Sequence, residues 1–240
     1  MHLAGEDTAS ASRGTRASEA APIEHGNNVE PRDGGSVDSP VEKVFLLSPA
    51  RVNGARAGLL LNPNAPFALA REFHRGGLPL AAIFAFASGL YFRGKITYAR
   101  RFAPRRSAIR VITTNAGLLD PDTVLTPGML RAFGTVDIHE SDERYHSPLR
   151  RDAKALARKL GPKGVAVLLG SIATAKYRDV LLECFGARLR FPSDFIGRGD
   201  MSRGALLLRA AAAGHELPYV SVTGAVFRGK RAPRVSDMKT

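Results

Sequence analysis

The feature that most constrains the fold is a pair of short apolar runs, at residues 43–48 and 165–169. Each run has the length of a β-strand and is apolar at consecutive positions, so both of its faces must be covered. The second run is followed by a glycine turn and then by a helical stretch over residues 174–185. A buried strand, a tight turn and a helix form the repeating unit of open parallel sheets. The sequence therefore predicts an α/β fold, a single domain with a mixed, largely parallel sheet flanked by helices.

Other segments extend this prediction along the chain. Residues 109–114 are β-branched and partly alternating, which indicates a further strand, and residues 188–191 and 219–222 predict two shorter ones. Apolar periodicity, proline starts and glycine stops predict helices over residues 66–74, 79–87, 96–102, 148–160 and 201–213. Loops are expected at residues 88–95 and 115–122, and irregular structure over residues 126–147.

The two ends of the chain differ in composition from the middle. Residues 1–40 are rich in small and acidic residues and contain no aromatic side chain, so too little apolar surface is available to offset the entropy of ordering. We expect a disordered tail over residues 1–40, an α/β domain over residues 41–227 and a flexible basic tail over residues 228–240.

The net charge is strongly positive, since 35 lysines and arginines outnumber 22 acidic residues and give +13. Such a balance favours a polyanionic partner, either a nucleic acid or a phosphorylated small molecule. The alternative is a general bias toward arginine, in which case the charge reports no partner.

The single cysteine and the apolar pattern bear on the compartment. Cys184 has no second cysteine to pair with, which excludes an internal disulfide and fits a reducing environment. The longest uncharged run, residues 76–92, is interrupted by glycines and a proline and is too short to span a membrane. We expect a cytoplasmic protein with no membrane partner, and the sequence leaves the oligomeric state open.

The standard catalytic motifs do not occur in the sequence. It contains no Walker phosphate loop, no dinucleotide-binding glycine fingerprint, no His-Glu-x-x-His helix and no nucleophile elbow. Cys184 lies beside Phe185 in an apolar helical stretch, which is typical of a small buried hydrophobe rather than a nucleophile. We expect no cofactor and no metal site, and the sequence identifies no catalytic residue.

Residues 197–204 read Gly-Arg-Gly-Asp-Met-Ser-Arg-Gly and precede an apolar run. Asp200 suits the N-cap of a helix that begins near Met201, and such a helix points free N–H groups and a positive dipole end at the space before it. Arg198 and Arg203 flank that space with guanidinium groups suited to phosphate. The stretch predicts an anion site; the alternative is a capped core helix whose arginines pair with local acids.

Residues 88–95 interleave aromatic and basic side chains. This mixture suits the stacking of a base on Tyr91 beside phosphate contacts from Arg93 and Lys95. The alternative is structural, with Tyr91 and Phe92 packed inside and the two cations pointing to water.

Four short stretches follow one another in a distinctive order within residues 43–210. They are Leu46-Leu47-Ser48-Pro49-Ala50-Arg51, Ser88-Gly89-Leu90-Tyr91 with Tyr98-Ala99, Gly117-Leu118-Leu119 with Pro121, and Gly170-Ser171 with Lys176-Tyr177 followed by residues 198–203. In this order they resemble the YaaA-type peroxide-stress protein family, although Lys176 stands where the family has an acid. The resemblance implies a mixed α/β sheet with inserted helices and a DNA-binding role in oxidative stress. A distant similarity of that fold to uracil-DNA glycosylases also implies nucleobase chemistry as an alternative.

Two functional hypotheses follow from the charge, the loops and the resemblance. The first is a DNA-binding protein of the stress response, with phosphate contacts from Arg198, Gly199, Ser202, Arg203, Arg93, Lys95, Ser171 and Lys176 and base contacts from Tyr91, Asn115 and Tyr177. The alternative is an enzyme acting on a nucleotide or nucleobase, N-glycosidase-like or a transferase, with a phosphate held at the helix near Met201. This enzyme requires one pocket that joins residues 48–51, 88–95, 115–120, 171–177 and 198–203. A third reading is a globular protein whose basic charge is incidental.

Overall fold

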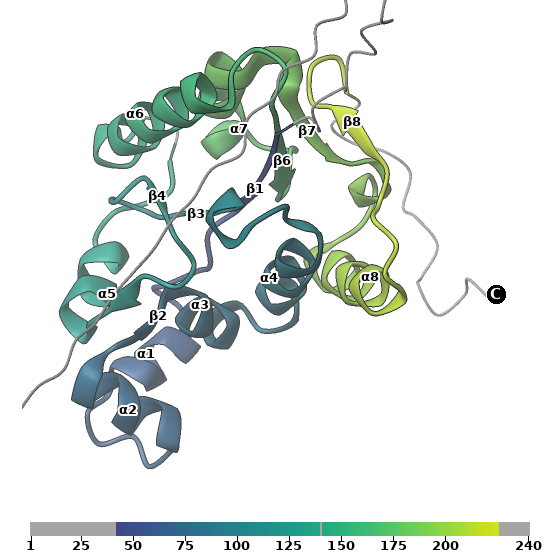
Figure 1. Cartoon of the computed structure of the whole chain (residues 1–240). Helices are drawn as coiled ribbons and strands as arrows, with labels where there is room; N and C mark the ends of the chain where they lie inside the picture. Colours follow the sequence, from purple (N-terminus) through teal and green to yellow (C-terminus); the bar gives the residue numbers. More distant parts are fainter. Residues whose placement is uncertain (1–41, 140, 226–240) are drawn as a thin grey trace, which may run out of the picture. The chain divides into compact units, whose positions relative to one another are not determined.

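The computed structural model describes residues 42–139 and 141–225, in which helices surround one six-stranded sheet (Figure 1). The strands lie in the order β4-β3-β1-β6-β7-β8. Their bounds are β1 Lys43–Leu47, β3 Ile109–Ile112, β4 Leu118–Leu119, β6 Val165–Leu169, β7 Leu189–Pro192 and β8 Tyr219–Ser221. The four central strands are parallel, and the two edge strands are antiparallel to their neighbours. The predicted α/β fold with a mixed, largely parallel sheet is confirmed. The tails predicted over residues 1–40 and 228–240 lie outside the described residues.

β1 is the first strand in sequence but occupies the middle of the sheet. It pairs with β3 on one side and with β6 on the other, so that Leu46 lies opposite both Arg110 and Leu168. The chain therefore moves to one side of β1 to form β3 and to the other side to form β6 and β7. In open α/β sheets, ligands bind beyond the carboxyl ends of the strands at such a reversal. The topology points to the ends of β1 and β6.

Helices cover both faces of the sheet. Their bounds are α1 Ala55–Leu61, α2 Ala68–Gly76, α3 Leu80–Ser88, α4 Leu90–Phe102, α5 Pro127–Gly134, α6 Glu143–Leu160, α7 Ala175–Phe185 and α8 Asp200–Ala213. α4 and α8 lie on one face, and α6 and α7 on the other (Figure 1). A separate two-stranded ribbon pairs β2 (Leu78–Pro79) with β5 (Val124–Leu125). None of the helices within the described ranges is long and apolar enough to cross a membrane.

α4 and α8 touch backbone to backbone through two glycines. A Cβ atom on Gly94 would lie 2.6 Å from the carbonyl oxygen of Gly204, and a Cβ atom on Gly204 would lie 2.8 Å from that of Leu90. Only glycine permits this approach. The contact fixes the first turns of α4 beside the start of α8.

Three segments differ from the sequence-based expectation. The loop expected at residues 88–95 is wrong beyond Gly89, because α4 begins at Leu90 and only Gly89, at φ 61°, separates it from α3. The irregular structure expected over residues 126–147 is also wrong. Thr126 accepts a hydrogen bond from the Met129 amide and caps α5, and Asp142 caps α6 in the same way. α6 therefore starts several residues before its proline, and α1 is a helix that the sequence pattern does not predict.

Candidate active site

A cavity of about 790 Å³ opens at the carboxyl ends of β1 and β6. The lining comes from the segments after β1, β3 and β6, from the end of α5, from the α3–α4 junction and from the start of α8. In chain order the lining residues are 48–53, 88, 91, 114, 133, 134, 136–139, 171, 174, 176, 177 and 200. The cavity thus lies at the reversal of strand order. Its volume is in the usual range for sites that hold small molecules.

Ser48 is fixed at the wall of this cavity by the sheet itself. Its amide donates a hydrogen bond to the Leu169 carbonyl at 3.2 Å, which extends the β1–β6 ladder by one residue. The side chain is only 5% exposed. Gly170 leaves the room for it, since a Cβ atom there would lie 2.8 Å from Ser48 Cβ and 3.0 Å from the Tyr177 hydroxyl.

Lys95 reaches Ser48 from the buried face of α4. Its Nζ donates hydrogen bonds to the Ser48 carbonyl at 2.7 Å and to Ser48 Oγ at 2.8 Å, and it lies 4.4 Å from the centre of the Tyr91 ring. The residue is 1% exposed and makes no ion pair within the described part of the chain. Burial lowers the pKa of Lys95 to about 7, with the Asp200 charge opposing this shift. A large fraction of the amine is therefore neutral at physiological pH.

Tyr177, on α7, holds the other side of the Ser48 hydroxyl. Its oxygen accepts a hydrogen bond from the Ser171 amide at 3.0 Å. Burial raises the pKa of Tyr177, while the Ser48 side chain and the Ser171 amide partly oppose the shift, so the phenol is neutral. Ser48 thus lies between a buried amine and a buried phenol.

Tyr91 presents a further polar group to the cavity. Its hydroxyl is buried, and among the described residues it has no hydrogen-bond partner. Burial raises its pKa, and the nearby Arg203 charge opposes the shift only in part. Buried polar groups in proteins nearly always have a partner, so this hydroxyl, with the Arg203 side chain nearby, stands out among the groups of the lining residues.

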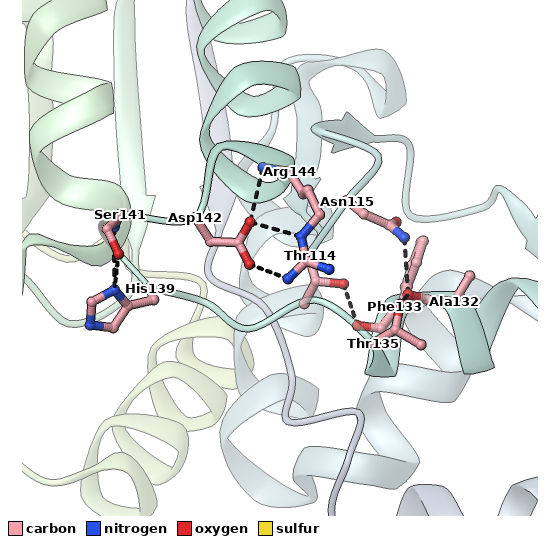
Figure 2. A network of polar contacts seen from close by, with 9 residues as sticks. All are labelled: Thr114, Asn115, Ala132, Phe133, Thr135, His139, Ser141, Asp142 and Arg144. Carbon is pink, nitrogen blue, oxygen red and sulfur yellow. Dashed lines mark hydrogen bonds and ion pairs between the residues drawn. The ribbon is translucent and has the colours of Figure 1, made fainter.

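Hydrogen bonds join the segment after β3, which contributes Thr114 to the cavity lining, to the end of α5 (Figure 2). Thr114 Oγ1 donates to the Phe133 carbonyl at 2.6 Å, and the Asn115 amide donates to the Ala132 carbonyl at 3.0 Å. Farther along, His139 Nδ1 lies 2.8 Å from Ser141 Oγ. These contacts hold residues 133–139 at the cavity.

The cavity gathers some of the residues that the sequence predicts as site residues and leaves others outside. Tyr91, Ser171, Lys176 and Tyr177 line it. The others do not: Arg93, Lys95, Asn115, Arg198, Gly199, Ser202 and Arg203. Of the five stretches that the enzyme hypothesis requires, four contribute at least one lining residue. Residues 115–120 contribute none, and their place is taken by Thr114.

Three positions need correction. Lys95 faces the interior, where it cannot contact a phosphate on the surface, because α4 already begins at Leu90 and places Lys95 one turn after Tyr91 on the buried face. Asp200 is not the N-cap of α8; Gly199 holds that position and Asp200 makes no capping hydrogen bond. The Asn115 amide is engaged with α5 rather than facing the cavity.

The two arginines expected at the start of α8 bind the protein's own backbone. Arg203 Nε and Nη2 both donate to the Phe195 carbonyl at 3.2 Å, and its guanidinium lies 5.5 Å from the centre of the Phe195 ring. Arg198 Nε donates to the Asp194 carbonyl at 2.9 Å. Both groups therefore help to fix the turn before α8.

Ser48 belongs to the stretch 48–51 that the enzyme hypothesis places in the pocket, but the sequence assigns it no role of its own, and residues 133–139 are candidates that the sequence does not indicate. A signal for Ser48 is present, since it directly follows the first buried strand, where α/β folds place ligand-binding groups. No such signal marks residues 133–139. In the described ranges, no group of three metal-ligating side chains lies close enough together to hold an ion.

Comparison with protein-family models, with curated proteins and with solved structures gave no match. The resemblance to the YaaA-type family remains a prediction. Any functional assignment therefore rests on the residues of the cavity.

Proposed function

We propose that the protein is an enzyme that acts on a nucleobase or nucleotide bound in the cavity at the ends of β1 and β6. The observation that carries this proposal is the convergence of Ser48, Tyr91 and Tyr177 on one cavity, with Lys95 directly behind Ser48. Reactive groups with shifted pKa values in a concave site are typical of active sites.

The lining suits a flat heterocycle. Tyr91, Phe133 and Ile138 supply apolar and aromatic surface, and the carboxylates of Asp137 and Asp200 supply acceptors for ring N–H groups. The Tyr91 hydroxyl, which is buried without a partner in the described residues, would hydrogen-bond a ring oxygen or nitrogen once its side chain turns toward the cavity.

A phosphate on the substrate would bind away from α8. The Asp200 carboxylate stands at the N-terminus of that helix, lines the cavity and is paired with Arg203 Nη1 at 3.5 Å, so the Arg203 charge there is already balanced by an acid. Arg51 and Lys176 are exposed cations in the parts of the lining that follow β1 and β6. These two residues are the better phosphate partners.

Binding of bases, nucleosides and nucleotides, measured by calorimetry, tests the proposal. Tyr91→Phe removes the unpartnered hydroxyl and should weaken the best ligand about 3- to 10-fold, the value of one hydrogen bond. Tyr145→Phe is the matched control, because its hydroxyl is also buried without a partner in the described residues but lies outside the cavity lining. The absence of binding by every compound, or equal weakening in both variants, would overturn the proposal.

A second hollow supports the nucleic-acid hypothesis as a second candidate. It measures about 470 Å³ and is lined by Arg100, Arg105 and Arg106 near the end of α4, with Asp122 paired to Arg100 at 2.5 Å. Clustered arginines of this kind suit phosphate contacts. A DNA-binding role in the stress response would use this surface rather than the start of α8.

Fluorescence anisotropy with duplex and single-stranded DNA at several salt concentrations tests this second candidate. Joint replacement of Arg105 and Arg106 by alanine should lower the slope of log affinity against log salt by about one for each phosphate that the variant no longer neutralises. Arg71 and Arg75, on α2, give a control pair of equal charge. Equal slopes for the two pairs, or no binding at low salt, would exclude the candidate.

A further inference from the structure

We propose that Ser48 is a covalent nucleophile and that Lys95 is the base that activates it toward an acyl group. The proposal rests on the proposed function in one respect, since the substrate must enter the same cavity. The substrate would be a carbonyl compound, either a cyclic amide of the heterocycle or an acyl derivative of it.

The geometry of the two groups is that of a nucleophile and its base. Lys95 Nζ lies 2.8 Å from Ser48 Oγ, within the range over which a base takes a proton. Its second hydrogen bond, to the Ser48 carbonyl at 2.7 Å, fixes the direction of the amine. The ammonium form donates to both Ser48 oxygens. After it loses a proton, the amine keeps one hydrogen on the carbonyl and turns its lone pair to Oγ.

Burial disfavours the charged form of the Lys95 amine, and the Arg203 charge acts in the same direction. The Asp200 charge and the rings of Tyr91 and Phe92, whose centres lie 4.4 and 5.0 Å from Nζ, favour the ammonium and oppose this effect only in part. A buried lysine that only stabilised the fold would be expected to pair with a carboxylate, and within the described residues Lys95 has none in contact. The burial that disfavours the ammonium makes the amine a base near neutral pH.

Ser48 faces the cavity while its base lies behind it. Ser48 lines the cavity and Lys95 does not, so a substrate would meet Ser48 first, with Lys95 Nζ 2.8 Å from Oγ. The Tyr177 hydroxyl is a positioning group, since the Ser171 amide holds it beside Gly170, where Ser48 also lies. The nucleophile is thus held from two sides.

The reaction proceeds in two balanced halves. Ser48 Oγ attacks the carbonyl carbon and its proton passes to Lys95 Nζ, while the carbonyl π electrons move to oxygen. When the carbonyl re-forms, the bond to the leaving group breaks, and that group takes the proton from Lys95. Water then attacks the acyl-serine with Lys95 again as base, and the proton returns to Ser48 as the acid leaves.

Covalent labelling of the full chain tests the pair without any nucleobase. A small fluorophosphonate and p-nitrophenyl acetate are the probes, read by intact mass with peptide mapping and by the burst of nitrophenolate. We expect one adduct, on Ser48, and a labelling rate that rises with pH through an apparent pKa near 7. Ser48→Ala should abolish both signals. Lys95→Met should slow them at least about 100-fold and remove the pH dependence, in line with the usual contribution of a general base.

Matched controls keep the result specific. Ser107→Ala and Lys163→Met remove an exposed serine and an exposed lysine outside the cavity lining, and both should label like the unaltered protein. Lys95→Arg retains a charge but not a neutral base, so it should be as slow as Lys95→Met. Melting curves establish that each variant is folded; if Lys95→Met does not fold, Ser48→Ala and Lys95→Arg still decide the matter.

The outcomes separate this inference from the proposed function. Absence of both the Ser48 adduct and the burst in folded protein, or equal rates with Lys95→Met, overturns the inference. If Ser48→Ala still binds a heterocycle in that case, the proposed function stands. If Ser48 is labelled but no heterocycle binds, the catalytic pair is supported and the proposed substrate class is wrong.

Discussion

Replacement of Lys95 by methionine tests the energetic consequence of burying an amine behind Ser48. The pKa of Lys95 falls from 10.5 to about 7 on folding, chiefly through burial. Between these pH values the unfolded chain binds one proton more than the folded protein at this residue. Stability should therefore increase as the pH rises through this window, and the whole penalty is present below pH 7.

The size of the effect follows from the pKa values. One pKa unit corresponds to about 1.4 kcal/mol, so the buried ammonium costs about 5 kcal/mol of unfolding free energy below pH 7. Between pH 7 and 10.5, Lys95 should add about 1.4 kcal/mol per pH unit to the slope of the unfolding free energy against pH, on top of the contribution of all other groups. Lys95→Met removes the titrating group, keeps most of the side-chain length and removes this excess slope.

The assay is urea unfolding at about pH 6, 7, 8 and 9, with the free energy extrapolated to zero denaturant for both proteins. The difference between them cancels the pH dependence that other groups contribute to each protein alike. Lys163→Met, which removes an exposed lysine, should keep the slope of the unaltered protein. Parallel stability curves for the unaltered protein and Lys95→Met would refute the reasoning, because they would mean that Lys95 titrates alike in both states.

Two further predictions concern packing and capping. Gly204→Ala should destabilise the protein by about 1–3 kcal/mol, because its Cβ atom would lie 2.8 Å from the Leu90 carbonyl oxygen. The control is Gly58→Ala in α1, where the added Cβ atom meets nothing within 4 Å and should stabilise the protein by up to about 1 kcal/mol. Thermal melts of both variants measure the difference. Thr126→Ala should cost about 1 kcal/mol through removal of the cap on α5, measured by urea unfolding, and no change would show that this cap contributes nothing.

The sheet is predictable because its strands are identified by local pattern. Residues 165–169 are apolar at every position, and in the structure four of these five are buried between two layers of helices. Continuous apolar runs of this length need cover on both faces, and only a sheet between helices provides it. The position of β1 in the middle depends instead on which strands pair, and no local pattern encodes that.

The helix boundaries are less predictable for two reasons. The pattern around Gly89 predicts a loop, although a single glycine at φ 61° suffices to join α3 to α4. The Thr126-Pro127 pair is a sound start signal for a helix, with threonine as cap and proline at the first position, but the segment after it lacks a clear apolar period. Because residues 90–95 are expected to form a loop and not the start of a helix, the sequence does not indicate that Lys95 points into the interior.

The site is only half predictable, because its central contact joins distant parts of the chain. Tyr91 is identified from its aromatic and basic stretch, and Lys176 and Tyr177 from the resemblance, and all three line the cavity. The contact between Ser48 and Lys95 spans 47 residues and depends on the rotation of α4. That rotation is set by the glycine contact with α8, which no periodicity in either segment reveals.

Stability and reactivity at Lys95 arise from one physical cause, so they should change together. Burial raises the free energy of the ammonium, which weakens the fold below pH 7 and at the same time leaves a neutral amine beside Ser48. Lys95→Met should therefore lose the labelling of Ser48. Its free energy of unfolding should exceed that of the unaltered protein by more at about pH 6 than at about pH 9. Lys95→Arg should lose the labelling but keep the charge, so its stability should not recover as the pH rises to about 9. A variant series in which reactivity falls without any change in the pH dependence of stability would separate the two properties and show that the amine is not the base.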